Sequence, residues 1–217
     1  MSEQSGAKPP VVNKAGGGIL KWALWGVALF GVAAVVYIMA KALSKPAPEI
    51  HTALAPEATA PAVKSVTEKL AHPADGQPGP DYAFTDAAGK KLTLADLKGQ
   101  VVVLNLWATW CAPCKLEMPT LAGLQAAYAG KPVKVVVVSI DRPEQAQAAR
   151  TFIAQHAPLA FYADPDAKMP WALKPIASDV PTTVVYGRDG LERGRVSGGA
   201  DWSGPGAKAL IDRVLAQ

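Results

Sequence analysis

Cysteine and histidine are scarce in this chain. Its 217 residues include two cysteines, Cys111 and Cys114, and three histidines. Two cysteines are too few for a small domain held together by several disulfides. They are also too few for a zinc site made only of cysteine, because such a site needs four ligands. We therefore expect no structural metal and no bound cofactor.

Charge is sparse as well. Asp, Glu, Lys and Arg make up 18% of the residues, and the net charge of +4 is not concentrated in any segment. A nucleic-acid-binding surface needs a strong basic patch, so we expect no nucleic-acid partner. Half of the residues are hydrophobic, which excludes a disordered or collagen-like chain.

One long stretch carries no charge at all. It covers residues 22–40, and as a helix its 19 residues would span about the thickness of a bilayer core. We predict a short cytoplasmic tail over residues 1–18 and a transmembrane signal anchor over residues 19–42. A cleaved signal peptide is the alternative, since Ala40-Lys41-Ala42 fits a small-x-small cleavage pattern. The flanking lysines favour a cytoplasmic N-terminus and place the rest of the chain outside the cytoplasm.

A proline- and alanine-rich segment follows. Residues 46–80 hold seven prolines, a composition typical of an extended spacer. We predict a linker over residues 43–79, with one possible short helix at residues 62–70. Its expected role is to hold a domain away from the membrane.

Residues 80–217 have the length of a single domain, and strand and helix patterns alternate along them. Two continuous apolar runs, 101–107 and 133–140, are typical of central strands buried on both faces. Shorter strands are expected at 82–85, 91–93, 161–163, 182–187 and 192–196. Helices are expected at 93–97, 112–128 with an interruption at Pro119, 143–156, 165–173 and 203–216. This order predicts an α/β sandwich with parallel pairing at its centre.

The two cysteines lie at the start of a predicted helix, directly after a central strand, in the run Trp110-Cys111-Ala112-Pro113-Cys114. Unpaired N–H groups and the positive end of the helix dipole favour a thiolate there, so Cys111 is predicted to be the reactive sulfur. Cys114, three residues later, can reach Cys111 to form a disulfide. Half of a zinc site and an inert structural bridge are the alternatives. The domain offers His156 as its one histidine for zinc, and we expect His156 to be a helix-end surface residue.

The segment NLWATWCAPCKLEMP over residues 105–119, together with Val180-Pro181-Thr182, resembles the TlpA/ResA-like branch of the thioredoxin superfamily, whose members are membrane-anchored. The resemblance covers residues 80–217 and implies a thioredoxin-like three-layer sandwich with a mixed central β-sheet. It also implies a cis peptide bond before Pro181, facing the cysteines. Substrate contacts are expected from Trp110, Ala112, Pro113, Val180 and Pro181.

Glu117 is the next candidate. It follows Cys114 by three residues, so the two share a helix face, and no basic residue lies at positions 113, 114, 120 or 121 for a surface ion pair along the helix. A carboxylate facing an apolar pocket would have a raised pKa and could take the proton of Cys114. The family keeps an acidic residue at this place, whereas a solvated glutamate is the alternative. Asn105 departs from ordinary thioredoxins, which carry a buried acid there, and Trp107 is expected to pack in the core.

These residues predict a thiol-disulfide oxidoreductase with Cys111 as the nucleophile, Cys114 as the resolving cysteine and Glu117 as a proton shuttle. The resemblance favours a reductant at the bacterial inner membrane, single-pass, with its redox domain in the periplasm. It implies a membrane thiol-transporting electron donor and clients from copper-centre assembly of cytochrome oxidase or from cytochrome c assembly. A copper metallochaperone, a disulfide oxidase or isomerase, and a peroxidase are the alternatives. The CxxC spacing disfavours the metallochaperone, and no Pro-x-x-x-Thr/Ser-x-x-Cys pattern precedes Cys111 for the peroxidase.

Overall fold

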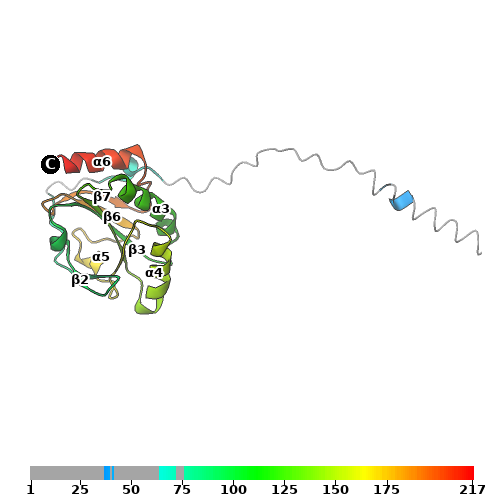
Figure 1. Ribbon diagram of the computed structural model, residues 1–217, viewed down its shortest axis with the longest axis horizontal. Coiled ribbons are helices and arrows are strands. Elements are labelled where there is room, and N and C mark those ends of the chain that lie inside the picture. Colours follow the sequence, from blue (N-terminus) through cyan, green and yellow to red (C-terminus); the bar gives the residue numbers. More distant parts are fainter. Residues whose placement is uncertain (1–36, 40, 42–63, 72–75) are drawn as a thin grey trace, which may run out of the picture. The chain divides into compact units, whose positions relative to one another are not determined.

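The computed structural model describes residues 37–39, 41, 64–71 and 76–217 (Figure 1). The chain divides into two compact units, residues 1–59 and 60–217, and the fold below is that of the second. No helix among the described residues is long and apolar enough to cross a membrane. The predicted tail (1–18) and anchor (19–42) lie outside the described residues, apart from the helical residues 37–39 and 41.

A mixed seven-stranded sheet organises the described domain, in the order β2-β1-β5-β4-β3-β6-β7. The strands β3, β4 and β5 pair in parallel, whereas β1–β2, β1–β5, β3–β6 and β6–β7 are antiparallel. The mixed central sheet is therefore confirmed. The strands are β1 Phe84–Asp86, β2 Lys91–Leu92, β3 Val101–Trp107, β4 Val133–Ser139, β5 Phe161–Ala163, β6 Thr182–Tyr186 and β7 Glu192–Ser197.

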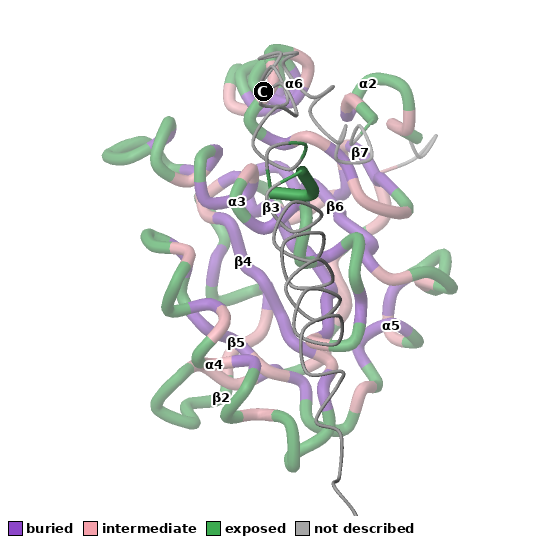
Figure 2. Tube along the Cα trace, turned by 90° about the vertical axis from the view of Figure 1, so that its right-hand side faces the viewer, coloured by how far each residue is buried: buried purple, intermediate pink, exposed green. Residues whose placement is uncertain are grey.

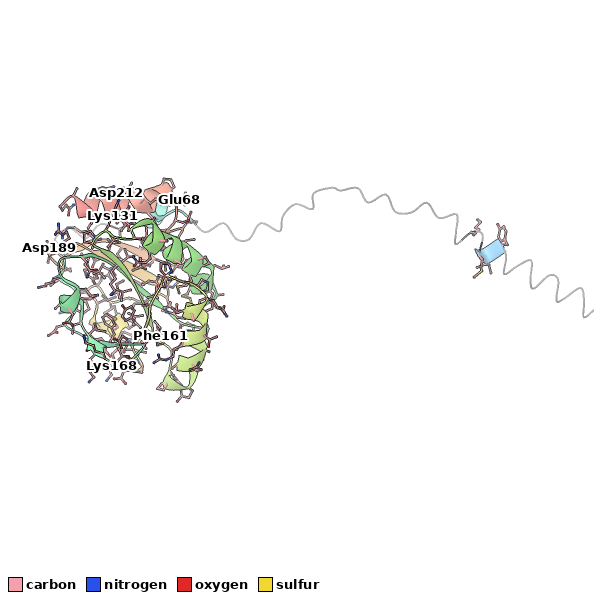
Figure 3. The ribbon with its side chains drawn as sticks, in the orientation of Figure 1. Glu68, Lys131, Phe161, Lys168, Asp189 and Asp212 are labelled. Carbon is pink, nitrogen blue, oxygen red and sulfur yellow. A yellow bond between two sulfur atoms is a disulfide. The ribbon has the colours of Figure 1, made fainter. Side chains whose placement is uncertain are left out.

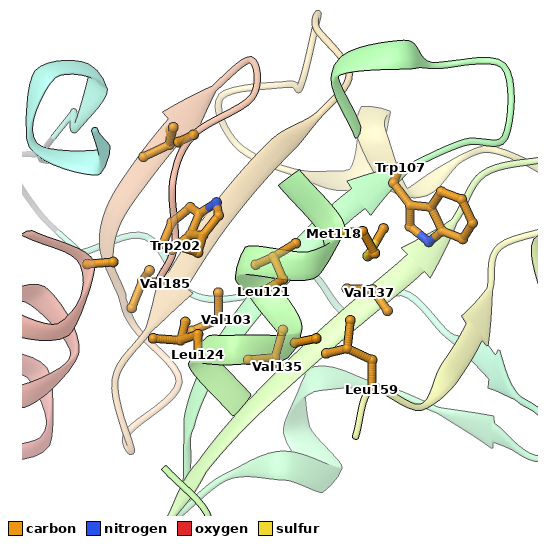
Figure 4. Packing of buried hydrophobic residues seen from close by; sticks show 14 of the residues in the cluster. Val103, Trp107, Met118, Leu121, Leu124, Val135, Val137, Leu159, Val185 and Trp202 are labelled. Atoms are coloured by element: carbon orange, nitrogen blue, oxygen red, sulfur yellow. The ribbon is translucent and has the colours of Figure 1, made fainter. Parts of the chain in front are cut away.

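Helices cover both faces of the sheet. They are α2 Val66–Lys69, the 3-10 turns η1 Leu94–Leu97 and η2 Pro143–Gln145, α3 Ala112–Ala127, α4 Ala146–Ala154, α5 Met169–Ala172 and α6 Pro205–Leu215. Alternate residues of β3 point to opposite faces. Val103 and Trp107 belong to the core cluster that also holds residues of α3, α4 and α6, and Figure 4 shows them with Met118, Leu121 and Leu124 of α3. Leu104 and Leu106 belong to a second cluster with residues of η1 and α5.

Apolar and polar residues do not alternate along β3, because both of its faces are buried. All seven of its residues are buried, and the purple core in Figure 2 follows β3 and β4. Burying apolar surface on both sides of these strands supplies the main driving force for the fold. Charged side chains such as Lys168 and Asp189 lie at the periphery of the domain (Figure 3).

Three helix predictions need correction. The helix α3 runs through Pro119 without interruption, since Pro119 is exposed and the carbonyl group that loses its donor belongs to the exposed Lys115. The predicted helix at 143–156 starts as the separate 3-10 turn η2. The predicted helix at 165–173 shortens to α5, because the carboxylate of Asp164 accepts the backbone N–H of Met169 and holds the preceding turn.

The predicted linker is too long at its C-terminal end. Its residues 43–63 and 72–75 lie outside the described residues, but 64–71 and 76–79 pack on the domain. Val66 is buried in the main core, and isolated β-bridges join Ser65 to Asp201 and Ala71 to Arg195. The short helix predicted within residues 62–70 is observed as α2, but the docking of 64–71 and 76–79 on the domain was not predicted from the proline- and alanine-rich composition.

Candidate active site

Cys111 and Cys114 form a disulfide at the N-terminus of α3, directly after the central strand β3. Cys111 is the N-cap residue of the helix, and Pro113 occupies the first turn, where its missing N–H costs nothing. Cys111 retains 5% of its surface, whereas Cys114 has none. Cys111 is therefore the more accessible of the two cysteines, whereas Cys114 is closed off from solvent.

The backbone around Cys111 favours a negative charge on its sulfur. The backbone N–H of Cys114 donates to Cys111 Sγ at 3.3 Å, one of the unpaired donors of the first helical turn. The helix dipole adds to this effect. An anionic sulfur released at this position would thus be stabilised by groups already in place.

The segment before β6 faces the disulfide. The Val180–Pro181 peptide bond is cis, and the carbonyl oxygen of Val180 lies 3.5 Å from Cys111 Sγ. Trp110, which precedes Cys111 in the chain, is 61% exposed and lines a surface pocket of about 690 Å³ with Ile140, Arg142, Glu144, Gln145 and Ala167. Ala112 and Pro113 are exposed between the two cysteines. An open surface with apolar and charged parts therefore surrounds the reachable sulfur.

Glu117 is fully buried one turn after Cys114. Its carboxylate accepts two hydrogen bonds, at 2.8 Å from Asn105 Nδ2 and at 2.9 Å from the backbone N–H of Ala200. Burial raises the pKa of Glu117 to about 7, and this effect outweighs the hydrogen bonds, which act in the opposite direction. A carboxyl group with this pKa can both accept and release a proton near neutral pH.

Asn105 connects Glu117 to the sheet. Its Nδ2 also donates to Thr183 Oγ1 on β6, at 2.9 Å, while its Oδ1 is buried without a partner. The sequence pointed to Asn105 only as a departure from ordinary thioredoxins. The structure shows that this amide holds the candidate proton shuttle directly.

The role of Asp141 was not predicted from the sequence. It is buried just beyond β4, and its carboxylate accepts hydrogen bonds from the backbone N–H and the hydroxyl group of Thr109 and from the hydroxyl group of Ser139. Thr109 lies two residues before Cys111, so Asp141 fixes the turn that presents the nucleophile. An acidic residue at the carboxyl end of a buried strand was the available signal.

Two secondary predictions can be checked directly. Trp107 is fully buried, as expected. His156 follows α4 as expected but is half-buried rather than on the open surface, and it packs against Phe152 with ring centroids 4.5 Å apart and the rings tilted by 43°. Among the residues that the structure describes, no cluster of three or more metal-ligating side chains is found.

The comparisons with known proteins agree with this geometry. Residues 76–191 match the AhpC/TSA family. The chain belongs to this family. It is also similar to the thiol-disulfide oxidoreductase ResA of Bacillus cereus, with 41% identity over 81 residues, which are 37% of this chain and 46% of that protein. The thioredoxin-like protein YneN of Bacillus subtilis is 44% identical over 73 residues, which are 34% of this chain and 42% of YneN. The matched part thus spans less than half the length of these relatives.

Solved structures extend the similarity over the domain. A Chlorobium tepidum protein assigned as a thiol:disulfide interchange protein DsbE shares 28% identity and a TM-score of 0.57, over 64% of this chain and 96% of that one. A DsbF homologue from Corynebacterium diphtheriae has the same fold, with a TM-score of 0.58 over 67% of this chain and 92% of that one, at 24% identity. The thioredoxin-like fold with a mixed central sheet is therefore confirmed, as is the resemblance to the ResA-like proteins.

Proposed function

We propose that the protein is a thiol-disulfide oxidoreductase that reduces disulfides in client proteins. One observation carries the proposal: the disulfide opens a helix directly after the central strand, with the partly exposed Cys111 as the helix N-cap and the fully buried Cys114 behind it. The more accessible sulfur can attack a client disulfide, and the buried one lies close enough to resolve the mixed disulfide that forms.

In the reduced protein, the Cys111 thiolate attacks a client disulfide. A bond forms between Cys111 and one client sulfur, the client disulfide breaks, and the second client sulfur leaves and takes up a proton. The Cys114 thiol then gives its proton to the Glu117 carboxylate and attacks Cys111. The client leaves with both sulfurs reduced, and its two electrons come from the dithiol, which becomes the Cys111–Cys114 disulfide.

Glu117 suits the second step. It is buried on the same helix as Cys114, and its pKa of about 7 allows it to accept the thiol proton and later release it. Trp110, Ala112, Pro113, Val180 and Pro181 are proposed to contact the client. An extended peptide beside Val180 could pair with its backbone.

The wider setting is also part of the proposal. The uncharged run at residues 22–40 would anchor the chain in the bacterial inner membrane, with the redox domain in the periplasm. A reductant there must be recharged, so a membrane protein that passes thiol equivalents outward is the proposed electron donor. The proposed clients are proteins of cytochrome oxidase copper-centre or cytochrome c assembly.

Trapping in cells tests this function. In the Cys114→Ser variant, Cys111 can attack a client but nothing resolves the mixed disulfide, so covalent adducts should accumulate, and mass spectrometry identifies the clients. The matched control is Cys111→Ser, which should form none. Adducts on Cys111→Ser but not on Cys114→Ser would reverse the assignment of the nucleophile, and adducts on neither variant would contradict the function. A redox titration of the CxxC pair decides between a reductant and an oxidase or isomerase.

A further inference from the structure

The segment at residues 64–71 is docked beside the active site. It carries the short helix α2, which packs against α6 and β7. The backbone carbonyl of Lys64 accepts the N–H of Asp201 at 3.0 Å, and Ala71 exchanges two hydrogen bonds with Arg195 at 2.8 and 2.9 Å. Backbone pairing at both ends and burial of Val66 between them fix the position of this segment.

Lys69 points from this segment to the loop at residues 198–200. Its ammonium group donates to the carbonyl oxygen of Gly199 at 2.8 Å. Gly198 has φ +75°, and a Cβ there would lie 3.1 Å from Lys69 Nζ. Glycine therefore provides both the backbone conformation and the space that the lysine uses.

The same loop contacts three residues of the active site. The N–H of Gly198 donates to the carbonyl of Pro181 at 2.7 Å, and the N–H of Ala200 donates to the Glu117 carboxylate at 2.9 Å. A Cβ on Gly199 would lie 3.3 Å from the carbonyl oxygen of Pro113, so the loop packs directly on the CxxC turn. A contact that fixes this loop therefore also fixes the N–H of Ala200 that donates to Glu117.

Lys69 also brings charge. Burial and hydrogen bonds have the larger effects on the pKa of Glu117, and the ammonium group of Lys69 adds a smaller effect that favours the ionised carboxylate. The other groups that act on the Glu117 carboxyl are neutral: the amide of Asn105 from β3, the N–H of Ala200 and the indole of Trp202. Since Lys69 is only half-buried, salt weakens its field but does not remove it.

We propose that Lys69 is a positioning residue of the active site: it holds the 198–200 loop against Pro113 and keeps the N–H of Ala200 on the Glu117 carboxylate. The segment at residues 64–71 then belongs to the active site and is not only a spacer. The consequence for client reduction rests on the proposed function. The effect on Glu117 does not, because it can be measured in the oxidised chain.

The test is a ¹³C NMR titration of the glutamate carboxyl groups in the full chain with its disulfide intact, with Glu117→Gln used to assign the signal. Lys69→Met should move the titration midpoint of Glu117 upward, on the order of half a pH unit, because the neighbouring positive charge is lost. Lys69→Arg keeps the charge and should stay near the wild type. Lys64→Met is the matched control: it removes an exposed lysine of the same segment and should leave Glu117 unchanged.

An unchanged Glu117 midpoint in Lys69→Met overturns the proposal, even if the melting temperature falls, because Lys69 would then be a structural contact only. An equal shift in Lys64→Met also overturns it, because the effect would then be a general one of segment charge. If the wild type reduces no client but Lys69→Met still shifts Glu117, the proposed function fails and the positioning role stands.

Discussion

The amide of Asn105 donates to the buried carboxylate of Glu117 at 2.8 Å and ties it to Thr183 on the neighbouring strand. Because residue 105 on β3 is neutral, Glu117 is the one acid of this hydrogen-bonded pair. A hydrogen bond from Asn105 favours the ionised carboxylate, while burial favours the protonated form. The balance of the two sets the pH at which Glu117 exchanges a proton.

Replacing this amide by a carboxyl group should disturb that balance. In Asn105→Asp, two acids would share one hydrogen bond, and repulsion between them should raise the pKa of Glu117 above 7. Carboxyl ¹³C NMR against pH measures the shift. Thr183→Ala serves as the control, since it removes the other partner of the amide without adding charge. A Glu117 titration that is unchanged in Asn105→Asp would contradict the role given to this pair.

Glu117→Gln should slow the resolving step. With no base to take its proton, Cys114 would attack the mixed disulfide on the order of 100-fold more slowly above pH 7. Stopped-flow reduction of a disulfide-containing peptide across pH 5 to 9 checks this. The wild type should lose rate as the pH falls below about 7, where Glu117 is protonated, and the variant should lack that step. A wild-type acid limb that persists in the variant would assign it to another group.

The same carboxyl group affects stability. Its pKa is raised from 4.5 to about 7 on folding, so the folded state keeps a proton that the unfolded state has released. This proton contributes about 3 kcal/mol to the free energy of unfolding. The contribution is fully present below pH 4.5 and is lost as the pH rises to 7. Urea unfolding of the wild type and Glu117→Gln at pH 4 and pH 8 measures it. From pH 4 to pH 8, the free energy of unfolding of the wild type should fall relative to that of Glu117→Gln.

Asp141 is expected to hold the turn before Cys111. Asp141→Ala would leave the backbone N–H of Thr109 without its acceptor and should cost about 1–3 kcal/mol of stability, besides slowing attack by Cys111. Asp141→Asn keeps one acceptor oxygen and should lose less. Chemical denaturation and alkylation rates of Cys111 report the two effects. Wild-type alkylation of Cys111 in Asp141→Ala would show that the turn needs no such support.

Trp110 should act on clients rather than on the fold. Because it is 61% exposed, Trp110→Ala should lower kcat/KM for a protein client while leaving the melting temperature close to that of the wild type. Trp171, 71% exposed and not part of the Trp110 pocket, provides a matched control. Equal losses for Trp110→Ala and Trp171→Ala would place the client elsewhere.

The sequence predicted those parts that depend on local pattern. β3 was predicted with its observed bounds because both of its faces are buried, and the CxxC turn was predicted because its residues are adjacent in the chain. Long-range contacts were not accessible. The Asn105–Glu117 hydrogen bond joins a strand to a helix, and Lys69 reaches Gly199 from a segment that reads as spacer. Pro119 was wrongly predicted to interrupt the helix, because the sequence does not show whether the carbonyl group that loses its hydrogen bond is exposed to water.

The reactivity of the two reduced cysteines tests the account most directly. The reduced chain is alkylated with iodoacetamide between pH 5 and 9, and mass spectrometry follows Cys111 and Cys114 separately. The account predicts that Cys111 reacts with an apparent pKa clearly below the value of about 8.5 of a free cysteine, while the buried Cys114 reacts more slowly at every pH. A pKa near 8.5 for Cys111, or faster alkylation of Cys114, would contradict it.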